Sequence, residues 1–226
     1  MISDTIQFNN VIYTYPDGNF TLSVSGLSLK ADEITFVTGD NGSGKTTLAK
    51  LMTGIIKPLK GDITLMGAPL SALSFGEIGK RIGYLWQNPG KQIFAQSVIE
   101  ELTFAGELKN PKMTQAEKEA TTTAALNWLE YFELAHLKDR TCFYLSQGEK
   151  QRLALAAVIA SGATYLVLDE PTKGLDSKRK KILEDTINKL KDEKKIGMCI
   201  ISHDDKFKEA LCERVITLSK GELADG

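Results

Sequence analysis

The sequence predicts an α/β fold with a mostly parallel sheet, an antiparallel β subdomain at the N-terminus and an inserted α-helical subdomain. Strand patterns alternate with helical patterns in the later half of the chain, as they do in parallel α/β sheets. Two strand patterns at the start are joined by a short turn, and the strand signal is absent between Val98 and Leu145. For 226 residues we expect one domain over 1–226, with the helical insert at about 98–150.

The first elements are strands. Residues 6–15 and 20–29 alternate apolar and polar side chains around a Pro-Asp-Gly-Asn turn, which predicts an antiparallel pair. A β-rich run at 33–39 ends in glycine, and helical spacing follows over 45–54, where Gly54 closes the pattern. This order predicts a strand, a loop and a helix.

The insert and the later elements follow the same rules. Thr114 and Glu117 have capping-box spacing, so a helix is expected to begin there. The apolar run at 153–168 is interrupted by polar residues and a glycine, which indicates a helix end, a turn and a buried strand rather than a membrane span. Further strands are expected at 61–67, 81–86, 164–170, 197–202 and 214–221, and a helix at 178–191.

Composition excludes some classes of function. The formal net charge is -1, from 28 basic and 29 acidic residues, so no large positive field is available for nucleic acid. Cys142, Cys199 and Cys212 lack the spacing of a zinc site, which favours unpaired thiols in a reducing compartment. The first ten residues lack the basic and apolar regions of a secretion signal, so a cytoplasmic location is expected.

The stretch GDNGSGKTT predicts a phosphate-binding loop. It fits G-x-x-x-x-G-K-[ST] and lies between a predicted strand and a predicted helix, as the core of a P-loop NTPase requires. Lys45 is expected on the β and γ phosphates of ATP, and the Thr46 hydroxyl on Mg²⁺. The alternative is a glycine-rich turn that only enters a helix. The expected nucleotide-binding residues of the loop are Gly39, Asp40, Asn41, Gly42, Ser43, Gly44, Lys45, Thr46 and Thr47.

Two adjacent carboxylates end the apolar strand YLVLDEP. Asp169 is suited to Mg²⁺, usually through a bound water, and Glu170 is suited to polarising the water that attacks ATP. An ordinary acidic strand end is the alternative, although the phosphate loop upstream favours the catalytic interpretation.

Three further motifs follow in a recognisable order. LSQGEKQR at 145–152 precedes the strand with LDEP, and KGLD at 173–176 and ISHD at 201–204 come after it. Together with the phosphate loop, this order resembles the ATP-binding cassette (ABC) family of ATPases over nearly the whole chain. In that family LSQGEKQR corresponds to the signature motif, KGLD to the D-loop and ISHD to the switch histidine.

The resemblance implies roles for three more residues. Gln87 resembles the glutamine that links Mg²⁺ and the attacking water to the helical subdomain, and His203 resembles the switch histidine at the γ-phosphate. A structural histidine is the alternative at His203, and His136 has no such context. Tyr15 resembles the aromatic residue that stacks on adenine, with Tyr13 as the second choice.

In the family two cassettes pack head to tail, and the signature of each covers the nucleotide of the other. This implies that Ser146 and the N–H of Gly148 bind ATP held by a second subunit. Ser146 and Glu149 also satisfy S-x-x-E, a capping box that would stabilise the helix itself. Gln147 and Glu149 depart from the common pattern LSGGQ, and Glu149 would repel phosphate unless it points back to its own cap.

The segment 87–104 resembles the ATPases of energy-coupling factor (ECF) transporters, which import vitamins and transition-metal ions. The matching residues are Gln92, Phe94, Val98, Glu100, Glu101 and Phe104. In that family the segment helps to form the groove for a coupling helix of the membrane partner. The alternative is plain core packing of Ile93, Phe94 and Phe104.

We therefore expect an ATPase, with ATP and Mg²⁺ as cofactors, that drives import of a vitamin or metal ion. The expected partners are integral membrane subunits and a second ABC ATPase, identical or sister, at the cytoplasmic face of the membrane, with no nucleic acid. Alternatives are an ABC transporter ATPase of another importer or exporter class, a soluble ABC regulator of ribosomes or DNA, and a small-molecule kinase.

Overall fold

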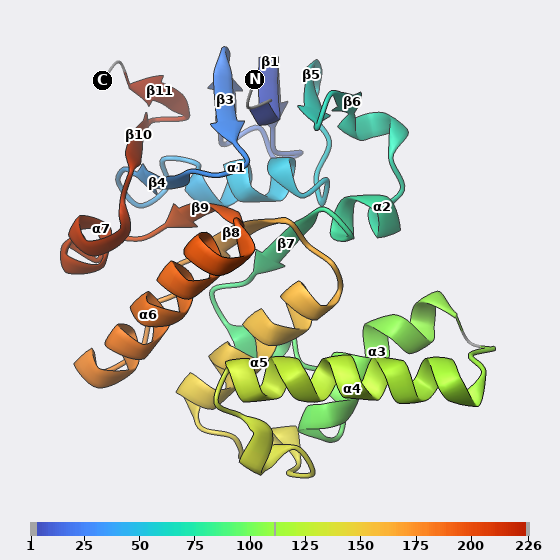
Figure 1. Cartoon of the computed structure of the whole chain (residues 1–226). Helices are drawn as coiled ribbons and strands as arrows, with labels where there is room; N and C mark the ends of the chain where they lie inside the picture. The colour runs from blue at the N-terminus through green and yellow to red at the C-terminus, as the bar shows by residue number, and fades with distance from the viewer. Residues whose placement is uncertain (1–3, 111, 225–226) are drawn as a thin grey trace.

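The computed structural model describes residues 4–110 and 112–224, and the strands of this part of the chain form a single mixed sheet (Figure 1). The strands are β1 (Asp4–Thr14), β2 (Thr21–Val24), β3 (Leu27–Lys30), β4 (Ile34–Thr38), β5 (Lys60–Leu65), β6 (Ala68–Pro69), β7 (Ile82–Leu85), β8 (Tyr165–Asp169), β9 (Gly197–Ile201), β10 (Arg214–Ser219) and β11 (Glu222–Ala224). The α-helices are α1 (Lys45–Met52), α2 (Phe75–Gly79), α3 (Val98–Lys109), α4 (Gln115–Tyr131), α5 (Gln147–Ala160), α6 (Ser177–Lys194) and α7 (Asp205–Leu211).

The sheet has a parallel and an antiparallel part. Strands β10, β4, β9, β8 and β7 are neighbours in that order, and each pair is parallel. Strand β1 pairs antiparallel with β2, β3 and β5. The carboxyl ends of parallel neighbours meet at one edge of a sheet, so the residues that follow β4, β7, β8 and β9 come together. The predicted fold class is confirmed.

Helix α1 lies between the two parts of the sheet. Successive strand residues point to opposite faces. On β8, Tyr165 and Val167 pack in the hydrophobic cluster that holds α1 and the antiparallel strands, whereas Leu166 and Leu168 pack in the cluster that holds α5 and α6. Figure 1 shows α1 above β7, β8 and β9, with α5 and α6 below them. Asp169, two residues after Val167, therefore falls on the α1 face.

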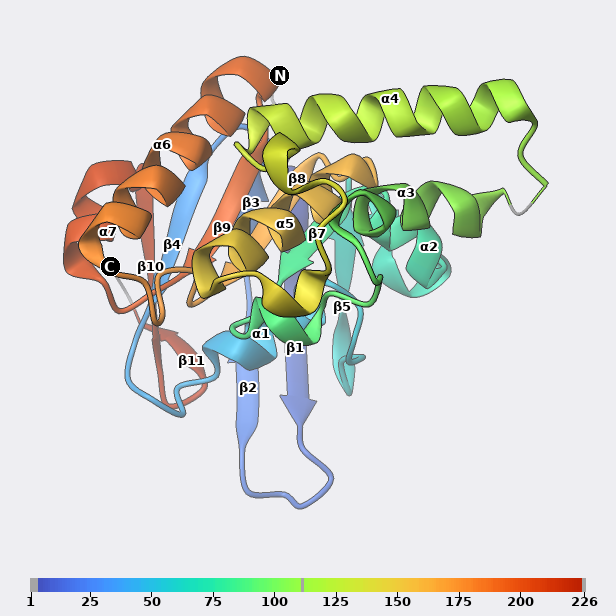
Figure 2. The ribbon, with the colours of Figure 1, turned by 90° about the horizontal axis from the view of Figure 1, so that it is seen from below.

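The insert is helical, as predicted. Helices α3, α4 and α5 pack together, and in both views α4 lies on the far side of the molecule from the β1–β2 hairpin (Figures 1 and 2). Helix α4 begins at Thr114 with a complete capping box, in which the Glu117 amide donates to Thr114 Oγ1 at 3.3 Å. The start of α3 is joined to the segment before α5, because the Val98 and Ile99 amides donate to the carbonyls of Arg140 and Lys138.

The predicted strand at 20–29 is interrupted in the structure. It forms β2 and β3, which pair with β1 on either side of a break at Gly26. Asn10 and Gly26 adopt φ angles of 50° and 69°, which take both strands out of the extended conformation nearly opposite each other. The short β11, which pairs with β10, was not predicted either.

The next two findings, on the cysteines and on membrane-spanning helices, apply to the described residues. Cys142, Cys199 and Cys212 are free thiols, and the first two are buried. Burial raises the pKa of Cys199 to about 12 and that of Cys142 to about 11, so both stay protonated at neutral pH. No helix in 4–110 or 112–224 is both long enough and apolar enough to cross a membrane.

Candidate functional site

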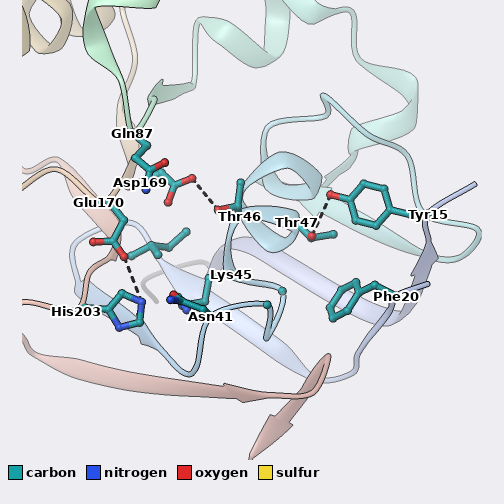
Figure 3. Close-up of a pocket in the computed structure, with 13 residues that line it drawn as sticks. Tyr15, Phe20, Asn41, Lys45, Thr46, Thr47, Gln87, Asp169, Glu170 and His203 are labelled. Atoms are coloured by element: carbon teal, nitrogen blue, oxygen red, sulfur yellow. Dashed lines mark hydrogen bonds and ion pairs between the residues drawn. The ribbon is translucent and has the colours of Figure 1, made fainter. Parts of the chain in front are cut away.

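A cavity of about 340 Å³ lies at the carboxyl edge of the parallel strands. Figure 3 shows aromatic side chains at one end, Lys45 in the middle and acidic groups with a histidine at the other end. The predicted site residues that line it are Tyr15, Asn41, Gly42, Gly44, Lys45, Thr46, Thr47, Gln87, Asp169, Glu170 and His203. Segments that are far apart in the chain therefore line one cavity, from Tyr15 after β1 to His203 after β9.

Phe20 and Ile201 complete the lining, although no sequence motif includes them as site residues. Phe20 lies across the β1–β2 turn from Tyr15, with ring centroids 6.4 Å apart. An aromatic residue on each side of one turn was the available signal. Tyr13, the second choice for adenine, contacts the Tyr15 ring edge-on at 5.0 Å and does not line the cavity.

The phosphate loop follows β4 and needs glycine for its shape. At Gly39, with φ of 138°, a Cβ would lie 2.1 Å from the Leu218 carbonyl oxygen. At Gly44, with φ of 107°, a Cβ would lie 2.8 Å from Leu22 Cδ1 and 2.8 Å from Phe20 Cζ. Gly39, Asp40 and Ser43 shape the loop from behind and do not line the cavity. The Ser43 hydroxyl is buried and has no hydrogen-bond partner among the described residues.

Helix α1 opens toward the cavity with free donors. No side chain in the described part of the chain caps its N-terminus, and its first turn carries no acidic residue. Backbone N–H groups at such an end attract anions. Lys45 Nζ donates to the carbonyl oxygens of Gly39 at 2.7 Å and Asp40 at 2.9 Å. Burial lowers the pKa of Lys45, although the nearby carboxylates of Glu170, Asp169 and Asp40 oppose this. The arrangement fits a polyphosphate.

Asp169 ends β8 as a buried carboxylate, with a relative exposure of 4%. Its Oδ2 accepts from Thr46 Oγ1 at 3.0 Å and from the Tyr84 hydroxyl at 3.1 Å. Among the described residues it forms no ion pair, which leaves a buried charge that a cation would compensate. The hydroxyl of Thr46, the carboxylate of Asp169 and the amide oxygen of Gln87 are the oxygen ligands that Mg²⁺ prefers. The residues therefore fit this ion.

Glu170 points differently from Asp169 because the chain turns at that residue. Its φ is 51°, in the left-handed region, and its amide donates to the Ile201 carbonyl at 2.8 Å. A non-glycine residue in this region costs about 1–3 kcal/mol, so the surrounding structure must hold it. The turn brings Glu170 Oε1 within 3.4 Å of His203 Nε2, at the end of the cavity opposite Tyr15 (Figure 3). A carboxylate and an imidazole so arranged can hold and orient a water molecule.

The aromatic end is fixed to α1. The Tyr15 hydroxyl and Thr47 Oγ1 form a hydrogen bond of 3.2 Å, so the ring is held beside the start of the helix. Tyr15 and Phe20 form an apolar wall at the end of the cavity opposite Glu170 (Figure 3). Such a wall suits a flat heteroaromatic ring.

Gln87 follows β7 and is exposed, so its side chain reaches both this cavity and a wider one that adjoins it. Beyond it, large apolar side chains face solvent: Trp86 is 40% exposed, Phe94 72% and Phe104 41%. Ile93 packs against the core. Core packing therefore accounts for Ile93 and not for Phe94.

The signature segment lies outside the cavity. Ser146 caps α5, and Glu149 points back to it, since Glu149 Oε2 accepts from the Ser146 amide at 2.7 Å. Burial opposes ionisation of Glu149, but the hydrogen bonds from Ser146, together with the charges of Arg140 and Arg152, lower the pKa of Glu149. Ser146 is exposed, whereas Gly148 is covered by Arg179, whose Cδ would lie 2.9 Å from an added Cβ. The structure does not bring Ser146 or Gly148 to the cavity of the same chain.

Known proteins are similar to this chain in sequence and in fold. A family model described as ABC transporter matches residues 22–173, more than half of the chain. A protein of Pyrococcus abyssi (strain GE5 / Orsay), named as an ABC transporter ATP-binding protein, is 36% identical over 220 residues, which cover 96% of this chain and 81% of that protein. A protein of Methanosarcina mazei with the same name is 39% identical over 213 residues, 93% of this chain and 35% of that protein.

Two solved structures are similar over almost the whole chain. CbiO1 of Clostridium perfringens, part of the ABC transporter complex CbiONQ, is 29% identical with a TM-score of 0.84, over 98% of this chain and 87% of that chain. The ATP-binding cassette MJ0796, a dimer in a post-hydrolysis state bound to ADP and Pi, is 25% identical with a TM-score of 0.81, over 97% of each chain.

Proposed function

Because the chain belongs to the ABC transporter family, as an ATP-hydrolysing ATPase subunit, we propose that it drives import of a small substrate, a vitamin or a metal ion, through integral membrane subunits. The resemblance of its segment 87–104 to ECF ATPases supports import, as does its likeness to CbiO1, which is part of a CbiONQ complex. The observation that carries the proposal is one cavity that joins the phosphate loop, the two carboxylates, Gln87 and His203.

The order of groups along the cavity supports one orientation of ATP. The adenine stacks on Tyr15, with Phe20 behind it, and the triphosphate lies on the N-terminus of α1. Lys45 leaves the loop carbonyls and donates to the phosphate oxygens instead. The γ-phosphate then lies toward Glu170 and His203, at the opposite end from Tyr15 (Figure 3).

Thr46, Asp169 and Gln87 are the residues that would hold Mg²⁺. When bound, the ion neutralises charge on the phosphates and favours their transfer to water. The hydrogen bond from Thr46 to Asp169 orients both side chains before the ion arrives. Gln87, which lines the cavity beside Asp169 (Figure 3), would supply an amide oxygen.

Hydrolysis uses the pair at the other end. The Glu170 carboxylate accepts a hydrogen bond from the attacking water and draws its proton, while His203 orients the water and the γ-phosphate. The left-handed turn at Glu170 supports this role, because strain at a residue that the fold holds firmly is common in active sites.

A second ATPase subunit, identical or sister, completes the site. The exposed Ser146 at the start of α5 would meet nucleotide held by another cassette. Because Glu149 is turned back to its cap, its charge does not prevent that approach. The dimeric state of MJ0796 supports this proposal.

The test is to trap the complex before hydrolysis. Glu170→Gln should bind ATP with wild-type affinity, lower turnover by at least 100-fold, and form an ATP-dependent dimer detected by light scattering. Adding Ser146→Arg to this variant should prevent the dimer and leave ATP binding by the monomer unchanged. A Glu170→Gln chain that hydrolyses ATP at the wild-type rate, or stays monomeric when saturated with ATP, would contradict the proposal.

A further inference from the structure

Tyr84, on β7, is a residue that none of the motifs includes, yet it forms hydrogen bonds at both of its ends. Its hydroxyl donates to Asp169 Oδ2 at 3.1 Å, and its carbonyl oxygen accepts from Gln92 Nε2 at 2.6 Å. The first contact reaches the Asp169 carboxylate, which lines the cavity. The second reaches the segment that follows Gln87.

The sheet dictates the first contact. Strands β7 and β8 are parallel neighbours, with Tyr84 opposite Val167. Both residues point to the α1 face, and Asp169 lies on that face two residues further along β8. A tyrosine side chain is long enough to cover this offset, whereas a phenylalanine in its place would leave the carboxylate without the donor.

Asp169 depends on this donor. Thr46 and Tyr84 both donate to Oδ2, and no hydrogen bond to Oδ1 exists among the described residues. Thr46 is itself a proposed ligand of Mg²⁺, so Tyr84 is the donor to Asp169 that has no second proposed role. At neutral pH a tyrosine hydroxyl is protonated, which makes it a permanent donor to a carboxylate.

The second contact continues toward the exposed aromatic residues. Gln92 also accepts from the Trp86 amide through Oε1 at 3.1 Å, so its one side chain closes the loop that contains Gln87. Glu101, with 8% relative exposure, then accepts from the amides of Phe94 and Ala95 at 2.9 and 2.8 Å. Asp169 is thus connected to the exposed Phe94 by hydrogen bonds through Tyr84 and Gln92, and then by the backbone from Gln92 to Phe94.

We propose that Tyr84 is a positioning residue that orients Asp169 for Mg²⁺ and ties this carboxylate to the segment from Trp86 to Ala95. The inference rests on the proposed function, in which Asp169 holds Mg²⁺ and this segment faces the membrane partner. A shift of the segment moves the end of β7, and the Tyr84 side chain passes that movement to Asp169.

The experiment compares Tyr84→Phe with a matched control, Tyr165→Phe. Tyr165 lies on the same face of neighbouring β8, and its buried hydroxyl has no partner among the described residues, so its loss does not touch Asp169. Calorimetry measures ATP binding in EDTA and at increasing Mg²⁺, with the melting temperature of each variant as a check on folding.

Tyr84→Phe should raise the Mg²⁺ concentration for half-maximal binding about tenfold, because a hydrogen bond to a charged group is lost. Its affinity for ATP in EDTA should stay within about twofold of the wild type, as should both values for Tyr165→Phe. Gln92→Met, which removes both loop contacts, should raise the Mg²⁺ midpoint by a smaller factor of about three.

An unchanged Mg²⁺ midpoint in Tyr84→Phe would overturn the inference, and so would an equal loss of affinity in EDTA, which indicates a merely structural role. An unchanged Mg²⁺ midpoint in Gln92→Met would show that the segment from Trp86 to Ala95 is not coupled to Asp169. Failure of the proposed function has a different signature: the wild-type chain itself would then bind ATP with no dependence on Mg²⁺.

Discussion

Lys45 is a nearly buried cation whose hydrogen bonds, in the described residues, go to neutral carbonyl groups. Its relative exposure is 7%, and the acceptors belong to Gly39 and Asp40. Carbonyl oxygens stabilise an ammonium group without neutralising it, and burial therefore lowers the pKa of Lys45. A phosphate oxygen would supply the missing charge. The charged Lys45 side chain is thus more stable at this position when nucleotide is bound than when it is not.

Lys45→Ala should lower the affinity for ATP by roughly 100-fold, because charge-assisted hydrogen bonds to phosphate are lost. The same change should leave the melting temperature of the nucleotide-free protein equal or higher, since a buried cation is removed. Calorimetric titration and thermal unfolding measure the two effects. Lys50→Ala, in the last turn of the same helix, is the control for helix α1. Unchanged ATP affinity in Lys45→Ala would contradict the assignment of the loop.

Residues joined by local spacing were predictable, and residues joined through the sheet were not. Lys45 and Thr46 follow from one loop pattern, because the loop and the helix that it enters are contiguous in the chain. Tyr84 had only the pattern of a strand residue in the sequence. Its contact with Asp169 exists because β7 pairs with β8, some 80 residues later, and nothing in a single sequence states that pairing.

At the scale of elements, one acidic residue next to the candidate site links α6 to the start of α7. Asp204 caps α7 by accepting from the Phe207 amide at 3.2 Å, and it pairs with Lys180 of α6 at 2.5 Å. Burial raises the pKa of Asp204, but the hydrogen bonds from Lys180 and Phe207 outweigh this and lower it below its usual value. The ionised form is therefore stabilised in the folded protein, just after His203.

The pH dependence of Asp204→Ala follows from that direction. A carboxyl group whose pKa is lower in the folded state stabilises fully above its unfolded pKa of about 3.9, and the effect is lost as pH falls through the folded pKa. At pH 7 the variant should lose about 1–2 kcal/mol of unfolding free energy, from the cap and a partly exposed ion pair.

Urea unfolding at pH 7, 5 and 3 measures this effect. The difference from wild type should be the same at pH 7 and 5 and smaller at pH 3. Asp205→Ala, one residue along and 79% exposed, should change stability by less than about 0.5 kcal/mol. If the loss of unfolding free energy in Asp204→Ala grew as the pH fell, the predicted direction of the pH dependence would be wrong.

Element boundaries with their own capping chemistry were predictable from the sequence. The boxes at Thr114 and Ser146 are both present, with the amides of Glu117 and Glu149 as donors to the capping hydroxyls. The break between β2 and β3 was missed, because its cause is a pair of positive φ angles, at Asn10 within β1 and at Gly26 between β2 and β3. Asparagine and glycine each permit such angles, but only the strand pairing places them together.

At the scale of the whole molecule, Gln87 lies between two regions with different chemistry. On one side is the charged cavity, and on the other is a segment with exposed aromatic side chains. Glu101 and Gln92 accept hydrogen bonds from backbone amides of this segment. The segment is thereby held in place while its aromatic side chains face solvent. A rigid apolar surface of this kind is suited to a partner protein. Under the proposed function, that partner is the membrane subunit.

Phe94 allows this last expectation to be tested. Its side chain is 72% exposed, so Phe94→Ser should leave the folding and the ATP hydrolysis of the isolated chain unchanged. Apolar side chains at the centre of an interface commonly contribute about 2 kcal/mol or more, so membrane subunits recovered with the variant should fall at least tenfold. The control is Phe75→Ser, because Phe75 is 67% exposed on α2, outside the segment. Tagged variants isolated from membranes of the native cell give the measurement, with wild-type recovery as the reference. Equal recovery for Phe94→Ser and Phe75→Ser would show that the exposed aromatic side chains of this segment do not bind the transporter.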